Sequence, residues 1–121
     1  QECAALYFVE GIQTLQKLEV STSEFIASGG GSKSDCGVQI RADVFGIPFV
    51  RPRITEAGLL GAAMLAGIST GVFSSPEEAA QTFVKQDRVF EPDARRHAVY
   101  REKHARYEQL YPALKPILQT L

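Results

Sequence analysis

Residues 25–35 read Phe-Ile-Ala-Ser-Gly-Gly-Gly-Ser-Lys-Ser-Asp, and they join a short apolar segment to the start of a helical pattern. Glycine has no Cβ, so three in a row let the backbone take a positive φ and approach a ligand closely. The helix that follows would present free N–H groups and a partial positive charge, which suit an anion. The order of strand, glycine turn and helix is therefore typical of a phosphate-binding turn.

The residues of this turn leave a second interpretation open. The stretch is neither a P-loop of the form G-x-x-x-x-G-K-[ST] nor the dinucleotide pattern G-x-G-x-x-G. A flexible turn between a strand and a helix explains the three glycines as well as a phosphate cradle does. If Gly29–Gly31 are only a turn, the chain is a small helical interaction protein without a ligand.

Length and composition limit the classes of protein that the chain can belong to. It has 121 residues, of which 45% are apolar, and a formal net charge of −1. This length predicts one domain at most, and the composition argues against disorder. The small net charge gives no electrostatic case for nucleic acid or an anionic membrane, so we expect neither as a partner. No apolar run approaches the roughly 20 residues of a membrane span.

The termini, cysteines and histidines add further expectations. The chain starts without Met and without a basic region before its apolar residues, so we expect a piece of a longer protein with no signal peptide. Cys3 and Cys36 lack C-x-x-C spacing, which favours two reduced packing thiols in a cytoplasmic protein over a disulfide. His97 and His104 have no thiol or carboxylate cluster beside them, so we expect no metal site there.

Hydrophobic periodicity predicts an alternation of helices and strands. Helices are expected over residues 2–18, 33–45, 56–68, 76–84 and 93–110, strands over 24–28 and 47–50, and an extended or edge piece over 88–92. The strand–helix–strand order around the turn predicts parallel pairing with a right-handed crossover. Ser32 or Ser34 could cap the second helix, Gly46 is placed to end it, and Asp93 is placed to cap the last helix.

Three of the helices carry more specific predictions. The helix over residues 56–68 is apolar nearly all round, which predicts that it is buried, and Gly58, Ala62 and Ala66 form a ridge that would let another backbone come close. Ser75 and Glu78 are expected to form a capping box around Pro76. One face of the last helix is interpreted as packing surface. Its members are His97, Tyr100, His104, Tyr107, Tyr111 and Leu114.

Four pieces of sequence follow one another in a fixed order. They are residues 25–35, the pattern Gln39-x-x-Ala42-Asp43-x-x-Gly46-x-Pro48, the run Glu56-Ala57-Gly58-Leu59-Leu60-Gly61-Ala62-Ala63, and Phe90-Glu91-Pro92-Asp93 before a helix that ends Leu110-Tyr111-Pro112. Together they resemble the C-terminal domain of FGGY-family carbohydrate kinases over nearly the whole chain. Within the family the chain looks closest to the xylulose-kinase and autoinducer-2-kinase branch, with glycerol kinases further off.

This resemblance implies a fold and a set of site residues. The fold would be α/β, a helix-rich part of an actin-like ATPase (ribonuclease H-like) domain with a short parallel sheet, and residues 1–121 would be the C-terminal portion of the nucleotide-binding domain. In the family, ATP phosphorylates a sugar or polyol hydroxyl with Mg²⁺ bound. Gly29, Gly30 and Gly31 would give N–H groups to the phosphates. Ser32, Lys33, Ser34 and Asp35 would border the ribose or adenine, although glycerol kinases often place Asn where this chain has Asp35.

The resemblance also implies what the chain lacks. Family kinases are roughly four times as long, and their sugar site, Mg²⁺ site and catalytic Asp precede this segment. Phosphoryl transfer needs in-line positioning, a metal and usually a base. Asp43 lies mid-helix and is interpreted as a structural hydrogen-bonding residue, so the isolated chain should be inactive.

Two more expectations concern partners and the alternative function. We expect a second copy of this chain, or the rest of the parent protein, to cover its sheet edge and helix faces. The alternative to a kinase is a non-catalytic actin-like nucleotide-binding or interaction module.

Overall fold

The computed structural model describes residues 2–120, apart from the side chains of Cys3, Leu15 and Gln16. The helices are α1 (Glu2–Lys17), α2 (Asp35–Phe45), α3 (Ala57–Ser69), α4 (Pro76–Phe83), α5 (Ala94–Tyr107) and α6 (Leu110–Leu118), and a 3₁₀ turn covers Gly30–Ser32. The strands are β1 (Phe25–Ile26), β2 (Phe49–Pro52) and β3 (Gln86–Phe90). The predicted elements are thus present, although β1 is shorter than the predicted 24–28, and β2 and β3 are displaced by two residues from the predicted 47–50 and 88–92.

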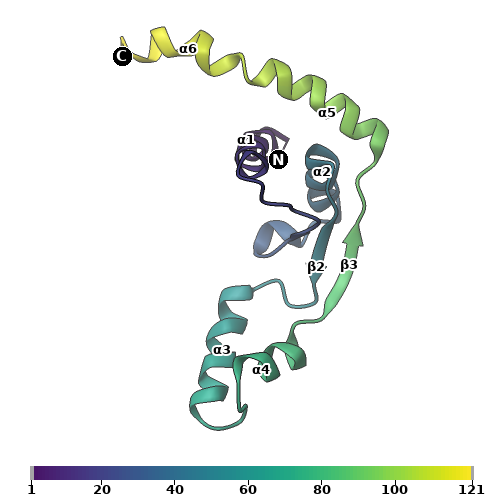
Figure 1. Ribbon diagram of the computed structural model, residues 1–121, viewed down its shortest axis with the longest axis vertical. Helices are drawn as coiled ribbons and strands as arrows, with labels where there is room; N and C mark the ends of the chain where they lie inside the picture. Colours follow the sequence, from purple (N-terminus) through teal and green to yellow (C-terminus); the bar gives the residue numbers. More distant parts are fainter. Residues whose placement is uncertain (1, 121) are drawn as a thin grey trace.

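The elements are arranged along an elongated molecule (Figure 1). Helix α2 packs against the sheet, α1 lies beside α2, and α5 passes along this end of the molecule before α6 continues outward as an arm. Helices α3 and α4 form a pair beyond the other end of β2 and β3 (Figure 1). The glycine turn therefore belongs to the half of the molecule that contains α1, α2 and α5.

The three strands form one sheet in the order β1–β2–β3. Strand β1 pairs parallel with β2, placing Phe25 opposite Phe49, as the strand–helix–strand order predicts. Strand β3 pairs antiparallel with β2 and is an edge strand. The predicted parallel sheet is therefore corrected to a mixed one. The chain leaves β2, passes through α3 and α4, and enters β3 at the end of the sheet where it left β2, so β3 runs antiparallel to β2.

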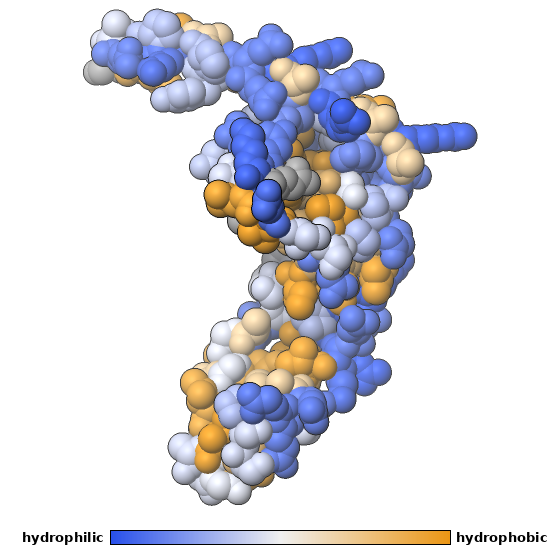
Figure 2. All heavy atoms as spheres, in the orientation of Figure 1, coloured by the Kyte–Doolittle hydropathy of each residue, from blue (hydrophilic) through white to orange (hydrophobic). Residues whose placement is uncertain are grey.

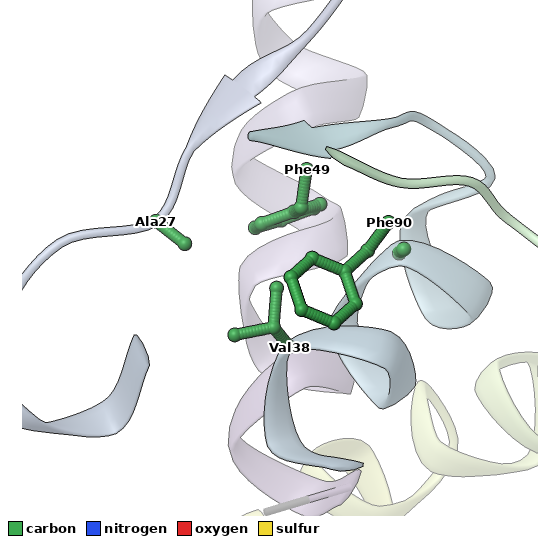
Figure 3. Packing of buried hydrophobic residues seen from close by; sticks show 5 residues of the cluster. Ala27, Val38, Phe49 and Phe90 are labelled. Carbon is green, nitrogen blue, oxygen red and sulfur yellow. The ribbon is translucent and has the colours of Figure 1, made fainter. Parts of the chain in front are cut away.

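Helix α2 is packed on two sides, and this places the core. One buried cluster joins it to the sheet through Ala27, Val38, Ala42, Phe49 and Phe90. Figure 3 shows the Phe49 and Phe90 rings and Val38 meeting in this cluster. A second cluster joins α2 to α1 and α5 through Ala5, Leu6, Val44 and Tyr100. Because α2 contributes to both clusters, its position is fixed by the sheet on one side and by two helices on the other.

The prediction that the apolar helix is buried is wrong for this chain. None of the residues of α3 is buried. Leu59 is 73% exposed, and a Cβ added to Gly58 would meet no atom within 4 Å. Orange, apolar surface gathers around the α3 end of the molecule in Figure 2. An all-round apolar pattern predicts burial only where other elements surround the helix, and within residues 2–120 the element packed most extensively against α3 is the short helix α4.

The helix ends confirm most of the predicted caps. Ser34 caps α2, and Asp93 caps α5 by accepting hydrogen bonds from the backbone N–H groups of Arg95 and Arg96. Ser75 caps α4 by accepting from the N–H of Glu78. The capping box is corrected, because the Glu78 carboxylate accepts from the N–H and hydroxyl of Ser74 rather than from Ser75.

The C-terminal end differs from the prediction in two ways. Helix α5 ends at Tyr107, and α6 follows as a separate helix that no prediction covered. The packing face of the last helix is confirmed for Tyr100 and His104, which are buried, but Tyr111 and Leu114 are exposed on α6. The predicted packing thiol at Cys36 is also wrong, because Cys36 is a free and exposed cysteine on the first turn of α2. The side chain of Cys3 lies outside the described residues.

Candidate functional site

The glycine turn begins with a conformation that glycine alone adopts readily. Gly29 has φ 76° and ψ −179°, and its N–H donates to the carbonyl of Thr55 at 2.6 Å. A side chain in this region of the Ramachandran map is strained, so the chain needs glycine at this position. The predicted positive φ in the turn is therefore confirmed, and the hydrogen bond ties the turn to the segment before α3.

Inside the turn, the backbone groups divide into bonded and unbonded ones. The N–H of Ser32 donates to the carbonyl of Gly29 and that of Lys33 to the carbonyl of Gly30. Within the described part of the chain, the N–H groups of Gly30 and Gly31 have no acceptor. Backbone N–H groups are strong hydrogen-bond donors. These two are therefore the N–H groups of the turn that can donate hydrogen bonds to an anion.

The side chains of the turn are engaged within the fold. Ser32 is fully buried, and its hydroxyl donates to the carbonyl of Gly29 at 2.6 Å. The hydroxyl of Ser34 accepts from the N–H of Gly37 as the N-cap of α2. The Lys33 ammonium lies 2.8 Å from the Glu56 carboxylate, and both side chains are largely exposed. These contacts shape the turn, and Lys33 retains donors that can reach solvent.

Asp35 is held by two arginines that come from the neighbouring strands. Its Oδ1 lies 2.5 Å from Nη1 of Arg51 on β2, and its Oδ2 lies 2.6 Å from Nη1 of Arg88 on β3. The hydrogen bond from Arg51 is the main cause that lowers the pKa of Asp35 below its ordinary value. Arg51 also donates to the carboxylate of Asp87 and to the carbonyl of Ser32. This network fastens the start of α2, and with it the glycine turn, to the sheet.

Sequence reasoning missed the arginines of this network. The guanidinium groups of Arg51 and Arg88 both lie over the Phe90 ring, at 5.3 and 4.8 Å from its centroid. In antiparallel strands paired in register, side chains of opposed residues stand on the same face, and Arg51 is opposite Arg88. The sequence alone did not indicate that Arg51 and Arg88 are paired across the strands, because the antiparallel pairing of β3 was not predicted.

Asp43 confirms the interpretation of a structural residue. It is 1% exposed on α2. Its Oδ1 accepts from the N–H of Asp93 at 2.8 Å and from Gln39, and its Oδ2 lies 3.1 Å from Nε of Arg96. A buried carboxylate needs such partners, so Asp43 joins α2 to the start of α5 rather than facing a ligand.

Outside the turn, the described residues offer other surfaces but no metal-ligand group. Ser28, just before the turn, lines a cavity of about 270 Å³ whose walls are mainly apolar and come from β1, α3 and α4. Across residues 2–120, no three His, Cys, Asp or Glu side chains gather in a way that could hold a metal ion. Among the helices described, none combines the length and apolar character needed to cross a membrane.

Comparisons with known proteins agree with this arrangement. Residues 2–70 match the profile of the C-terminal domain of the FGGY family of carbohydrate kinases. The autoinducer-2 kinase of Escherichia coli (strain K12) is 33% identical over 112 residues, which cover 92% of this chain and 21% of that kinase. The xylulose kinase of Staphylococcus epidermidis (strain ATCC 12228 / FDA PCI 1200) is 30% identical over 112 residues, which cover 93% of this chain and 23% of that kinase.

A solved structure extends the likeness to the fold. The crystal structure of xylulose kinase from Rhodospirillum rubrum superposes with a TM-score of 0.75 and 26% identity, over 98% of this chain and 24% of that one. The chain belongs to the FGGY family of carbohydrate kinases, and its fold is a portion of the actin-like ATPase fold of these sugar kinases. It spans between 21% and 24% of the length of the three relatives named here.

Proposed function

We propose that this chain is the nucleotide-binding portion of an ATP-dependent kinase that phosphorylates a hydroxyl group of a sugar or polyol. The observation that carries the proposal is the turn at Gly29–Gly31 in a member of a carbohydrate kinase family. Its first glycine has a positive φ, and the N–H groups of Gly30 and Gly31 are free to receive an anion. The N-terminus of α2, which follows the turn in the chain, adds a partial positive charge.

The residues of the turn would divide the work of binding a nucleotide. Gly30 and Gly31 would donate N–H groups to phosphate oxygens, and Lys33 would meet solvent-exposed polar groups of the ribose or phosphates. Ser32, Ser34 and Asp35 would act through the backbone, because their side chains are committed to the turn, the cap and the arginine network. Asp35 would therefore contribute position rather than a direct contact with adenine.

The carboxylates beside the turn do not fit a Mg²⁺ site. Mg²⁺ prefers carboxylate and water oxygens in octahedral geometry. The carboxylates beside the turn, Asp35 and Glu56, are engaged by Arg51, Arg88 and Lys33. We therefore assign no Mg²⁺ ligand and no catalytic residue to this chain, and we expect it to phosphorylate no sugar by itself.

The proposed kinase would complete this chain with further protein. Helix α3 exposes Leu59 and Leu65, and within the described residues β1 leaves one edge of the sheet unpaired. Apolar patches and open sheet edges are surfaces that proteins usually cover. The partner would be the remainder of the parent kinase or a second copy of the chain, and the completed protein would be cytoplasmic.

The test of the turn is a titration of the ¹⁵N-labelled protein with ADP, followed by NMR. We expect weak binding, in the millimolar range, with shifts of the Gly30 and Gly31 amides and of the first turn of α2. Gly29→Ala should remove this response, because alanine is strained at the φ of Gly29. Gly71→Ala is the matched control, since Gly71 also has a positive φ and an added Cβ would meet no atom within 4 Å, but it follows α3 and lies outside the turn.

Two results would contradict the proposal. If ADP shifts only amides far from the turn, the turn does not bind the nucleotide. If Gly29→Ala responds to ADP like the wild type and Gly71→Ala, the positive φ of Gly29 has no part in binding. A micromolar dissociation constant would instead show that this chain contains more of the nucleotide site than we propose.

A further inference from the structure

The charged side chains around the glycine turn balance one another, with one exception. Lys33 is paired with Glu56. Asp35 and Asp87 are balanced by Arg51 and Arg88. Arg41 also reaches the turn, and among the residues described no carboxylate lies within ion-pair distance of its guanidinium. The turn therefore has one positive charge that the fold does not neutralise.

Arg41 reaches the turn because of its place on α2. Side chains of a helix tilt toward its N-terminus, so a long side chain from the second turn extends back past the first turn. A Cβ added to Gly31 would lie 2.6 Å from Nη2 of Arg41 and 3.5 Å from its Cζ. The guanidinium thus occupies the space that a side chain at position 31 would fill. A side chain at position 31 would therefore displace the guanidinium from the turn.

The guanidinium lies beside the backbone that carries the free N–H groups. Nη2 of Arg41 lies against Gly31, whose N–H, like that of Gly30, has no acceptor within residues 2–120. Arg41 is partly buried, so its charge is screened less than that of a fully exposed side chain. Guanidinium groups suit phosphate because they offer several N–H donors in a planar fork.

We propose that Arg41 is a phosphate-contacting residue of the nucleotide site, and that it gives the site its preference for phosphorylated nucleotides over the nucleoside. This inference rests on the nucleotide site proposed above and adds to it a charged group outside residues 29–35. The backbone N–H groups of the turn are neutral hydrogen-bond donors, whereas the guanidinium of Arg41 carries a formal positive charge. Its contribution should therefore depend on the number of phosphates and on ionic strength.

The experiment compares ADP and adenosine as probes by NMR titration of the wild-type chain, Arg41→Gln, Arg41→Lys and the control Arg95→Gln. Arg95 is an exposed arginine on α5, so this control removes one positive charge away from the turn. Arg41→Gln should weaken ADP binding by about fivefold to tenfold and change adenosine binding by less than about twofold. Arg41→Lys should recover part of the ADP affinity, and Arg95→Gln should match the wild type.

A second variant tests the same contact without removing the charge. Gly31→Ala should displace the guanidinium, since the atoms in its way belong to the end of a flexible side chain. We expect it to weaken ADP more than adenosine, as Arg41→Gln does. Added salt should reduce the difference between wild type and Arg41→Gln, because screening weakens a charge–charge contact.

The outcomes separate this inference from the proposed function. If ADP shifts the turn amides equally in wild type and Arg41→Gln, the nucleotide site stands and the role of Arg41 is overturned. If Arg41→Gln weakens adenosine as much as ADP, the residue contacts the nucleoside and the phosphate assignment is wrong. If ADP leaves the turn amides of the wild type unchanged, the proposed function and this inference both fail.

Discussion

Helices α2 and α3 differ in a way that their sequences alone would not suggest. Helix α3 is apolar along nearly its whole length, yet none of its residues is buried. Helix α2 mixes charged and apolar residues, yet Gly37, Val38, Ala42, Asp43 and Val44 are all buried on it. The difference lies in their neighbours, because α2 is packed between the sheet and two helices, whereas among the described residues the main neighbour of α3 is α4.

An apolar sequence pattern therefore indicates that a helix packs against another surface, but it does not indicate which part of the protein provides that surface. Removing apolar surface from water is favourable whether the covering residues belong to the same chain or to another one. For α2 the covering surface is formed by the sheet, α1 and α5 of this chain. For α3 it is missing from the described residues, and the chain spans only 21% to 24% of the length of the kinases it resembles.

The largest expected effect is on the half that contains α2. Phe90 is 2% exposed and belongs to the cluster of α2 and the sheet. Phe90→Ala should lower the free energy of unfolding by about 3 to 5 kcal/mol, because it removes a buried ring and leaves a cavity. Urea unfolding followed by circular dichroism measures this loss.

The matched variant makes the same substitution on the other half. Phe83 on α4 is 39% exposed and contacts the Phe73 ring edge to face. Phe83→Ala should cost only about 1 kcal/mol, since the ring keeps much of its exposure in the folded chain. Equal losses for the two variants would show that the α3–α4 half is as well packed as the α2 half. If Phe90→Ala leaves too little folded protein to measure, Val38→Ala tests the same cluster with a smaller cavity.

A smaller effect is expected from the ionic network that fastens α2 to the sheet. The hydrogen bond from Arg51 is the first cause that lowers the pKa of Asp35. A carboxyl whose pKa is lowered on folding stabilises the fold above its unfolded pKa of about 3.9, and this stability is lost as pH falls through the lower folded pKa. NMR titration of the Asp35 carboxyl carbon should therefore give a midpoint below that of an unfolded chain.

Arg51→Gln should move the Asp35 midpoint back toward the ordinary value, because Arg88 would remain as the only arginine bound to that carboxylate. Stability should then vary less with pH between the two pKa values of Asp35. Arg53→Gln serves as the control, because no ion pair joins Arg53 to a carboxylate in residues 2–120. An unchanged midpoint in Arg51→Gln would mean that the contacts of Asp35 in solution differ from those described here.

The smallest effect on stability is expected on α3. Leu59 and Leu65 are 73% and 68% exposed. Leu59→Gln and Leu65→Gln should each change the free energy of unfolding by less than about 0.5 kcal/mol, since exposed side chains contribute little to folding. If a second copy covers this face, both variants should instead weaken self-association in sedimentation experiments, and Val99→Gln on the exposed side of α5 should not. A large loss of stability would contradict the comparison between α2 and α3.

The sequence was a good guide wherever the signal is local. The positive φ at Gly29, the N-caps at Ser34 and Asp93, and the end of α2 at Gly46 depend on residues within a few positions of one another. The structural role of Asp43 was also predicted, and the structure supplies the reason, because a carboxylate that is 1% exposed needs hydrogen-bond partners. In each case the chemistry of one residue type limits the backbone or the hydrogen bond that it can form.

The tertiary structure decided what depends on distant residues. Asp35 meets Arg51 and Arg88 only because β3 returns antiparallel to β2, and no local pattern gives that direction. Arg41 meets Gly31 only because α2 leaves the turn at the observed angle. The exposure of α3 was likewise invisible, since periodicity reports which residues are apolar and not which element covers them. Local propensities act over a few bonds, whereas burial and ion pairing depend on how distant segments are packed.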